Sequence, residues 1–113
     1  MAVAKHFLLN EQERFRRGDE ARGEERYKDV KESVSSNAGE RAVRELHLWP
    51  WMDVVREGVA GVMCAYNMVN NSYACGNSWL LNGVLKDELG FQGFVVSDWL
   101  AQRTGVESVL AGM

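Results

Sequence analysis

Three apolar segments of the sequence are each followed by polar residues whose side chains could take part in chemistry. In chain order these residues are Lys5 and His6 with Asn10 nearby, Tyr66 and Asn67, and Ser97, Asp98 and Trp99. The carboxyl ends of parallel strands meet at one edge of a sheet, and active sites of parallel α/β folds lie at that edge. The three groups together therefore predict one site, although each group alone is a weak signal.

Asp98 is the most informative of these residues. A carboxylate that directly follows an apolar strand is costly to bury without a partner, so it indicates either a site or the N-terminal cap of a helix. From position alone the two interpretations are about equally supported. Trp99 favours the site, because an indole beside a carboxylate suits a sugar, whose apolar ring face packs on aromatic side chains.

Lys5 and His6 are adjacent, so a regular strand would direct their side chains to opposite faces. Near the end of a strand the pleat relaxes, and both could reach the same edge. The alternatives are a surface lysine whose stem lies along apolar neighbours and a hydrogen-bonded core histidine. For His6 taken alone, the core role is favoured.

The elements that would position these residues alternate between strands and helices. Strands are expected over 1–9, 59–66 and 91–97. The first is expected to be short and buried, and the last two are apolar runs typical of strands buried on both faces. Helices are expected over 40–58 with an interruption at Pro50, from Asn77 or Ser78 to about 89, and from Thr104 or Gly105 onward. This order predicts a parallel α/β fold. Three strands cannot close a sheet, so the chain would cover a third to a half of a (β/α)8 TIM-type barrel of about 250 residues.

Apolar residues at three- and four-residue steps define the expected buried faces of the first two helices. They are Ala42, Val43, Leu46, Trp49, Trp51, Val54 and Val55 in the first, and Leu80, Leu81, Val84, Leu85 and Leu89 in the second. Gly58 and Gly90 are placed to end these helices. Charges of both signs dominate 11–32, which is expected to be a solvated loop or an exposed helix. A polar turn is expected over 33–39 and a loop over 67–76.

The composition fits part or all of one small globular domain, since 46% of the 113 residues are hydrophobic and 26% are charged. The net charge of −3 gives no electrostatic footprint for nucleic acid or an anionic membrane. No apolar run approaches the roughly 20 residues that cross a bilayer, and the N-terminus lacks the pattern of a secretory signal. Because both ends are apolar and uncapped, we expect residues 1–113 to be an internal fragment. The alternative is a short natural protein with an oligomeric fold.

Cys64 and Cys75 enclose a loop of small and polar residues, and they could form a disulfide or remain two free thiols. They lack the close spacing and the histidine partners of a zinc site. Neither a metal nor an organic cofactor is expected.

A long distinctive stretch, GVMCAYNMVNNSYACGNSWLLNGVLKDELGFQGFVVSDW, runs from Gly61 to Trp99. AKHFLLNEQE over 4–13 and ELHLWPW over 45–51 accompany it. Together these stretches resemble glycoside hydrolase family 3, most closely its fungal β-glucosidases. Positions 17–32 match weakly, and Leu100 and Arg103 depart from the small residue and the histidine expected there. These departures bear on substrate specificity and leave the assignment of Asp98 intact.

The resemblance implies a retaining β-glucosidase in which Asp98 is the nucleophile that forms a covalent glycosyl–enzyme. The residues implied to contact the sugar or its pocket are Lys5, His6, Met63, Tyr66 and Trp99. Lys5 and His6 would donate hydrogen bonds to sugar hydroxyls, and Tyr66 would steady the nucleophile or the ring. No cofactor is implied.

The resemblance also implies a disulfide between Cys64 and Cys75, and therefore a secreted parent enzyme. A retaining glycosidase needs a second carboxyl group about 5–5.5 Å from the nucleophile. In the family it comes from a later α/β sandwich domain. Glu88 and Glu107 are not candidates, because each lies on a predicted helix. We therefore expect the 113 residues alone to be inactive.

The expected partners are a β-glucoside or cello-oligosaccharide substrate and the remainder of the parent enzyme with its acid/base domain; neither nucleic acid nor a membrane is expected. One alternative keeps the family and changes the activity to a β-xylosidase or an exo-glucanase. Another is a non-catalytic carbohydrate-binding fragment that stacks sugars on Trp49, Trp51, Trp79 and Trp99. Against it, the first three of these tryptophans fall on or beside helical apolar faces and are expected in the core.

Overall fold

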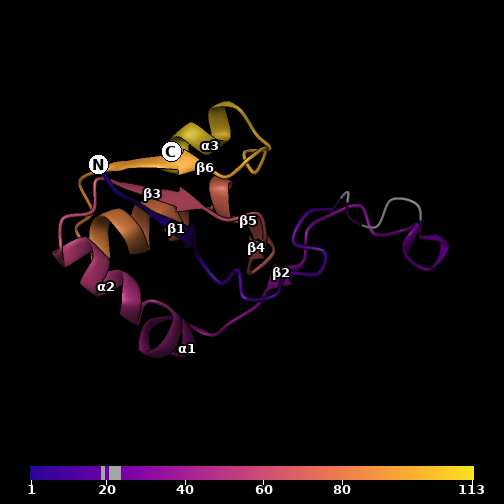
Figure 1. Ribbon diagram of the computed structural model, residues 1–113, viewed down its shortest axis with the longest axis horizontal. Coiled ribbons are helices and arrows are strands. Elements are labelled where there is room, and N and C mark those ends of the chain that lie inside the picture. The colour runs from indigo at the N-terminus through magenta and orange to yellow at the C-terminus, as the bar shows by residue number, and fades with distance from the viewer. Residues whose placement is uncertain (19, 21–23) are drawn as a thin grey trace.

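A three-stranded parallel sheet forms the centre of the computed structural model, which describes residues 1–18, 20 and 24–113 (Figure 1). Its strands are β1 (Val3–Phe7), β3 (Gly61–Cys64) and β6 (Phe94–Ser97), arranged in the order β1-β3-β6. Both pairings are parallel. Helical segments connect β1 to β3 and β3 to β6. The predicted α/β fold with about three parallel strands is confirmed.

A second, smaller sheet was not predicted. It consists of β2 (Ser35–Ser36), β4 (Met68–Val69) and β5 (Ser72–Tyr73), in the order β2-β4-β5. Asn70 and Asn71 join β4 to β5 with φ values of 49° and 69°, as a two-residue hairpin turn requires. The turn expected over 33–39 thus contains one strand, and the loop expected over 67–76 contains two. Two-residue strands are too short to show an alternating pattern in the sequence.

The first helical region is less regular than its apolar spacing suggested. It comprises α1 (Glu40–Ala42), the π-helical turn η2 (Val43–His47) and α2 (Trp49–Arg56). The amide of Leu48 donates to the carbonyl of Val43 at 2.7 Å, a five-residue step that widens the helix. This step buries Val43 and Leu48, whereas Leu46 and Trp49 are 67% and 64% exposed. The expected burial of Leu46 and Trp49 is therefore wrong.

The second helix agrees closely with the prediction. It is η4 (Trp79–Glu88), and the amide of Leu80 donates to Oδ1 of Asn77 at 3.0 Å, so Asn77 caps it. Leu80, Leu81, Val84 and Leu85 are all buried. The remaining helical segments are η1 (Glu25–Tyr27), η3 (Ala74–Gly76) and α3 (Val106–Leu110). Gly58 and Gly90 have φ values of 74° and 70°, which confirms them as helix ends.

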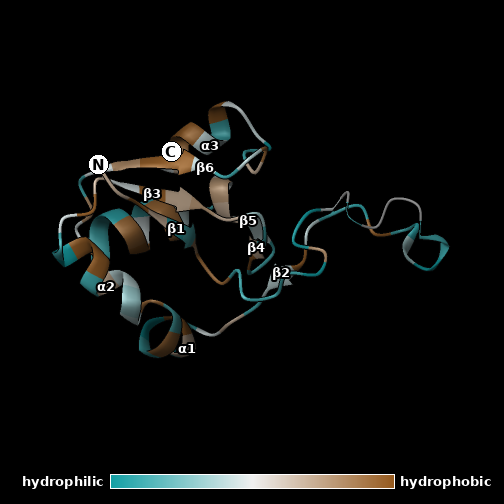
Figure 2. Cartoon of the chain, viewed as in Figure 1, coloured by the Kyte–Doolittle hydropathy of each residue, from teal (hydrophilic) through white to brown (hydrophobic). Residues whose placement is uncertain are grey.

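The main sheet has one covered face and one open face. Val62 and Cys64 lie on the covered face and are fully buried. Val3, Gly61 and Phe94 pair across the three strands on the other face, where Val3 is 39% and Phe94 is 46% exposed. The expectation that β6 is buried on both faces is therefore wrong for this chain, although β6 is mostly apolar (Figure 2). The expected burial of the first strand is also wrong, since only Phe7 of β1 is buried.

The charged segment that follows β1 extends away from the main sheet and is largely hydrophilic (Figures 1 and 2). Its described residues form loop and turn apart from η1, as expected for a solvated segment. The prediction for 11–32 also covers positions 19 and 21–23, which lie outside the described residues. Phe15 and Tyr27 pack edge to face at 4.9 Å, and the Arg14 guanidinium lies over both rings.

Candidate active site

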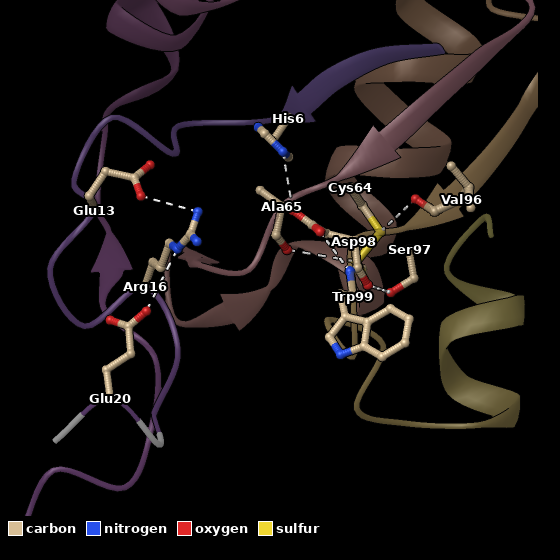
Figure 3. Close-up of polar contacts among 11 residues, drawn as sticks. His6, Glu13, Arg16, Glu20, Cys64, Ala65, Val96, Ser97, Asp98 and Trp99 are labelled. Carbon is tan, nitrogen blue, oxygen red and sulfur yellow. Dashed lines mark hydrogen bonds and ion pairs between the residues drawn. A yellow bond between two sulfur atoms is a disulfide. The ribbon is translucent and has the colours of Figure 1, made fainter. Parts of the chain in front are cut away.

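Residues from the two outer strands of the main sheet meet at its carboxyl edge. Nε2 of His6, in β1, lies 3.2 Å from Oδ2 of Asp98, which directly follows β6 (Figure 3). The His6 side chain is 25% exposed and that of Asp98 is 17% exposed. The pairing of β1 with β3 matches Lys5 to Met63 and then Phe7 to Cys64, so the register skips His6. This irregularity releases His6 from the regular alternation of the strand.

Main-chain and hydroxyl hydrogen bonds hold Asp98 in place. Its amide donates to the carbonyl of Cys64 at 3.3 Å, which ties it to the end of β3. Oδ1 accepts a hydrogen bond from the Trp99 amide at 2.6 Å. Ser97 Oγ donates to the Asp98 carbonyl at 2.6 Å (Figure 3). It also accepts from the Gln102 amide at 2.8 Å. The next helix, α3, begins only at Val106, so Asp98 does not cap it.

Tyr66, two residues beyond β3, is only 5% exposed. Burial raises the pKa of its hydroxyl, and the negative charge of Asp98 raises it further. Arg17 acts in the opposite direction and lowers the pKa of Tyr66. The guanidiniums of Arg16 and Arg17 lie 5.1 and 5.7 Å from the centre of the Tyr66 ring.

The other predicted site residues differ in how far they are exposed to solvent. Lys5, Met63 and Val96 pair across the three strands, so their side chains share the open face of the sheet. Lys5 is exposed and Met63 is partly buried. Trp99 is 76% exposed beside the carboxylate.

A pocket of about 370 Å³ adjoins the β1 side of the site. Lys5, His6 and Asn10 border it, together with Pro50 and Trp51 at the start of α2. Asp98 is not among its lining residues, so the pocket marks only the side of the site formed by Lys5 and His6.

The loops at this edge are cross-linked. Cys64 and Cys75 form a disulfide bond, as the family resemblance implied, and both are fully buried. Nδ2 of the buried Asn67 donates to the carbonyl of Leu8 at 3.1 Å and so joins the loop after β1 to the loop after β3. Within the part of the chain that the structure describes, no cluster of three or more His, Cys, Asp or Glu side chains could bind a metal.

Sequence reasoning missed three residues at this edge. Arg16 and Arg17 fall in or beside a charged stretch, and nothing in that stretch distinguishes a guanidinium over a ring from one in solvent. Asn67 was noted only as polar, and its role depends on a contact with Leu8, 59 positions away.

Comparison with known proteins matches residues 18–109 to the glycosyl hydrolase family 3 N terminal domain. This range covers most of the chain. The chain belongs to glycosyl hydrolase family 3. A probable β-glucosidase E of Neosartorya fischeri is 58% identical over all 113 residues, which span 10% of its length.

Solved structures agree with this family assignment. The β-glucosidase of Chaetomium thermophilum superposes on the whole family-3 chain with a TM-score of 0.90 and 59% identity, and the match covers 13% of that enzyme. A β-glucosidase of Thermotoga neapolitana, solved in complex with glucose, matches 97% of the chain with a TM-score of 0.79 and 37% identity; the match spans 13% of that protein. The chain thus spans about a tenth of the length of the proteins it resembles. No helix in residues 1–18, 20 and 24–113 is both long and apolar enough to cross a bilayer.

Proposed function

We propose that this family-3 chain is part of a retaining β-glucosidase that releases terminal β-D-glucosyl residues from the non-reducing ends of β-glucosides and cello-oligosaccharides. The observation that carries the proposal is the 3.2 Å contact between His6 and Asp98 at the carboxyl edge of a parallel sheet. The family assignment and the names of the relatives support the choice of substrate.

Asp98 acts as the nucleophile in this proposal. Its carboxylate attacks the anomeric carbon and forms a glycosyl ester, while the bond to the leaving oxygen breaks and that oxygen takes a proton from a second carboxylic acid. Water then adds to the anomeric carbon, gives a proton back to the second carboxylate and releases Asp98. The hydrogen bonds that fix the Asp98 main chain hold the attacking oxygen in a defined position.

The neighbouring residues bind and orient the sugar. Lys5 and His6 donate hydrogen bonds to its hydroxyls, Met63 lines the same subsite, and Tyr66 steadies the nucleophile. The exposed indole of Trp99 offers an apolar surface for the sugar or the leaving group.

The second carboxyl group comes from the remainder of the enzyme in this proposal. Glu88 lies at the end of η4, and Arg44 engages both of its carboxylate oxygens, each at 2.9 Å. Glu107 lies in α3. Neither is placed as the acid, so the chain alone is expected not to turn over substrate.

A secreted location for the complete enzyme forms part of the same proposal. The disulfide between Cys64 and Cys75 supports it, because such bonds persist in oxidising compartments.

A chimera tests the proposal. The matching segment of the Chaetomium thermophilum β-glucosidase is replaced by this chain, and hydrolysis of an aryl β-glucoside is measured. We expect activity in the chimera, and a loss of roughly 10⁴-fold in kcat on Asp98→Ala, as when a covalent nucleophile is removed. Azide should restore part of the turnover and yield an α-glucosyl azide.

Asp53→Ala serves as the matched control, because Asp53 is an aspartate in α2 with a side chain that is 66% exposed. It should leave kcat unchanged. An inactive but folded chimera, or an Asp98→Ala variant with ordinary activity, would contradict the proposal. Faster hydrolysis of an aryl β-xyloside than of the glucoside would instead favour the β-xylosidase alternative.

A further inference from the structure

The hairpin of β4 and β5 carries a sequence motif that the candidate site does not use. Asn70, Asn71 and Ser72 form an Asn-X-Ser triplet in which X is not proline, the acceptor motif for N-linked oligosaccharides. Every other asparagine of the sequence lacks a serine or threonine two positions later. Because so short a motif also occurs by chance, its exposure and its contacts in the fold decide whether it can be used.

The triplet lies at an exposed turn. Asn70 and Asn71 are both exposed, and they form the two-residue turn between β4 and β5 with φ values of 49° and 69°. The hairpin lies beyond the carboxyl ends of β1 and β3 (Figure 1). An oligosaccharide is bulky and hydrophilic, so it needs a turn of this kind, from which it can extend into solvent without displacing packed side chains.

The Ser72 hydroxyl has no structural role in the part of the chain that the structure describes. Ser72 pairs with Val69 across the hairpin, and no hydrogen bond from its side chain is found among the described residues. In the neighbouring β2, by contrast, Ser35 and Ser36 each donate a hydrogen bond from the hydroxyl, at 2.6 and 2.8 Å. The hydroxyl of Ser72 is therefore available to the enzyme that transfers the oligosaccharide, which requires this group two positions after the acceptor.

The contacts of Asn70 are compatible with an attached sugar. Its Oδ1 accepts a hydrogen bond from the Ala38 amide at 3.0 Å, and its Nδ2 donates to the Ala38 carbonyl at 3.2 Å. An attached sugar takes the place of one of the two protons of Nδ2, and Oδ1 can still accept from Ala38. Because Nδ2 is engaged once the hairpin meets Ala38, the transfer has to precede this contact during folding.

The hairpin also lies between Cys64 and Cys75, which form a disulfide bond. Disulfides form and persist in oxidising compartments such as the lumen of the endoplasmic reticulum. N-linked oligosaccharides are added to chains that enter the same compartment. The disulfide and the Asn-X-Ser triplet thus point independently to one cellular route.

We propose that Asn70 is a site of N-linked glycosylation. Nδ2 forms a bond to the anomeric carbon of the first N-acetylglucosamine of a lipid-linked oligosaccharide diphosphate. The bond from that carbon to the diphosphate oxygen breaks, the lipid diphosphate leaves, and Nδ2 gives up one proton. Glycosylation of Asn70 goes beyond the glycosidase activity proposed above and does not depend on it.

Peptide mapping of the chimera described above tests this site. The chimera is expressed with a secretion signal in a eukaryotic host, and an Asn-Gly-Thr triplet in a flexible C-terminal tail reports that the host enzyme has acted. An amidase removes the glycans in heavy-oxygen water, which leaves a labelled aspartate at each occupied asparagine. Mass spectrometry should find this label at Asn70 in most molecules.

Substitutions within the triplet separate the motif from its surroundings. Asn70→Asp removes the acceptor amide and Ser72→Ala removes the hydroxyl, so each should abolish the label, whereas Ser72→Thr should keep it. Asn71→Gly is the matched control, because it changes the neighbouring asparagine of the same turn, keeps an Asn-X-Ser triplet and suits a positive φ. The label on Asn70 should survive this change.

An unlabelled Asn70 in molecules whose tail is glycosylated would overturn the proposal, and so would a label that persists in Ser72→Ala. The measurement requires neither activity nor a folded chimera, since protein retained in the cell can be mapped in the same way. An inactive, folded chimera with a labelled Asn70 would contradict the proposed function alone. An active chimera with an unlabelled Asn70 would contradict the glycosylation site alone.

Discussion

The candidate site depends, residue by residue, on side chains that reach one edge of the main sheet from separate segments. Asp98 could be identified from the sequence because an unpaired charge directly after an apolar strand is costly to bury, which indicates a functional or capping role. Its contact with His6 could not be derived from spacing, because His6 escapes the strand alternation only through a local irregularity of β1. The position of Arg16 near the Tyr66 ring could not be predicted for a different reason. Arg16 is one of many charged residues in its segment, and nothing in their spacing distinguishes it from the others.

Tyr66 makes the pH dependence of stability testable at this scale. Burial raises the pKa of its hydroxyl in the folded state, so folding favours the protonated phenol. This contribution to stability is fully present below the unfolded pKa of about 10 and is lost as the pH rises through the higher folded value. Relative to Tyr66→Phe, the unmodified chimera should therefore lose unfolding free energy as the pH rises above about 10.

Denaturant unfolding of both proteins across this range provides the measurement. Below about pH 9 the phenol is protonated in both states, so the stability difference between the two proteins should be constant there. A difference that stays constant up to the highest pH would refute the assignment of a raised pKa to Tyr66.

At the scale of elements, the sequence was most informative where apolar spacing runs without interruption over several helical turns, as in the π-helical η4. The apolar face of η4 and the glycines that end the helices followed from periodicity and backbone freedom. The face of the first helical region followed only in part: Leu46 and Trp49, beside the five-residue step between Val43 and Leu48, are exposed, whereas the later Trp51 is buried as expected. Such a widened turn is set by tertiary packing. The small sheet escaped prediction because each of its strands has only two residues and because β2 joins the hairpin of β4 and β5 from a distant segment.

The entry into β6 gives a second prediction. A Cβ atom on Gly93 would lie 2.2 Å from the carbonyl oxygen of Ala60 and 2.6 Å from the Phe91 ring. Because a backbone atom cannot swing aside, Gly93→Ala should destabilise the chimera by about 1–3 kcal/mol. Gly83→Ala, in the middle of η4 with open space around its Cβ, should be neutral or stabilise by up to about 1 kcal/mol.

Thermal unfolding of the two alanine variants decides between these expectations. Equal melting temperatures would mean that β3 and β6 do not approach each other at Gly93 as the structure describes. A large loss in Gly83→Ala alone would point to crowding around η4 instead.

At the scale of the whole molecule, the main sheet has one face that the described residues leave open. Val3 and Phe94 on that face are partly exposed, and so are Val106, Val109 and Leu110 of α3. Apolar surface of this extent suits contact with further protein. The proposed missing acid fits the same arrangement, because a retaining glycosidase needs two carboxyl groups across one sugar bond.

Covalent trapping of Asp98 tests the central claim most directly. A 2-deoxy-2-fluoro-β-glucoside with a good leaving group slows release of the glycosyl–enzyme, so the sugar stays on the nucleophile. After proteolysis of the labelled chimera, mass spectrometry should find the fluoroglucosyl group on the peptide that contains Ser97, Asp98 and Trp99, and fragmentation should place it on Asp98. A stable label on any other carboxylate, with Asp98 unmodified, would contradict the account.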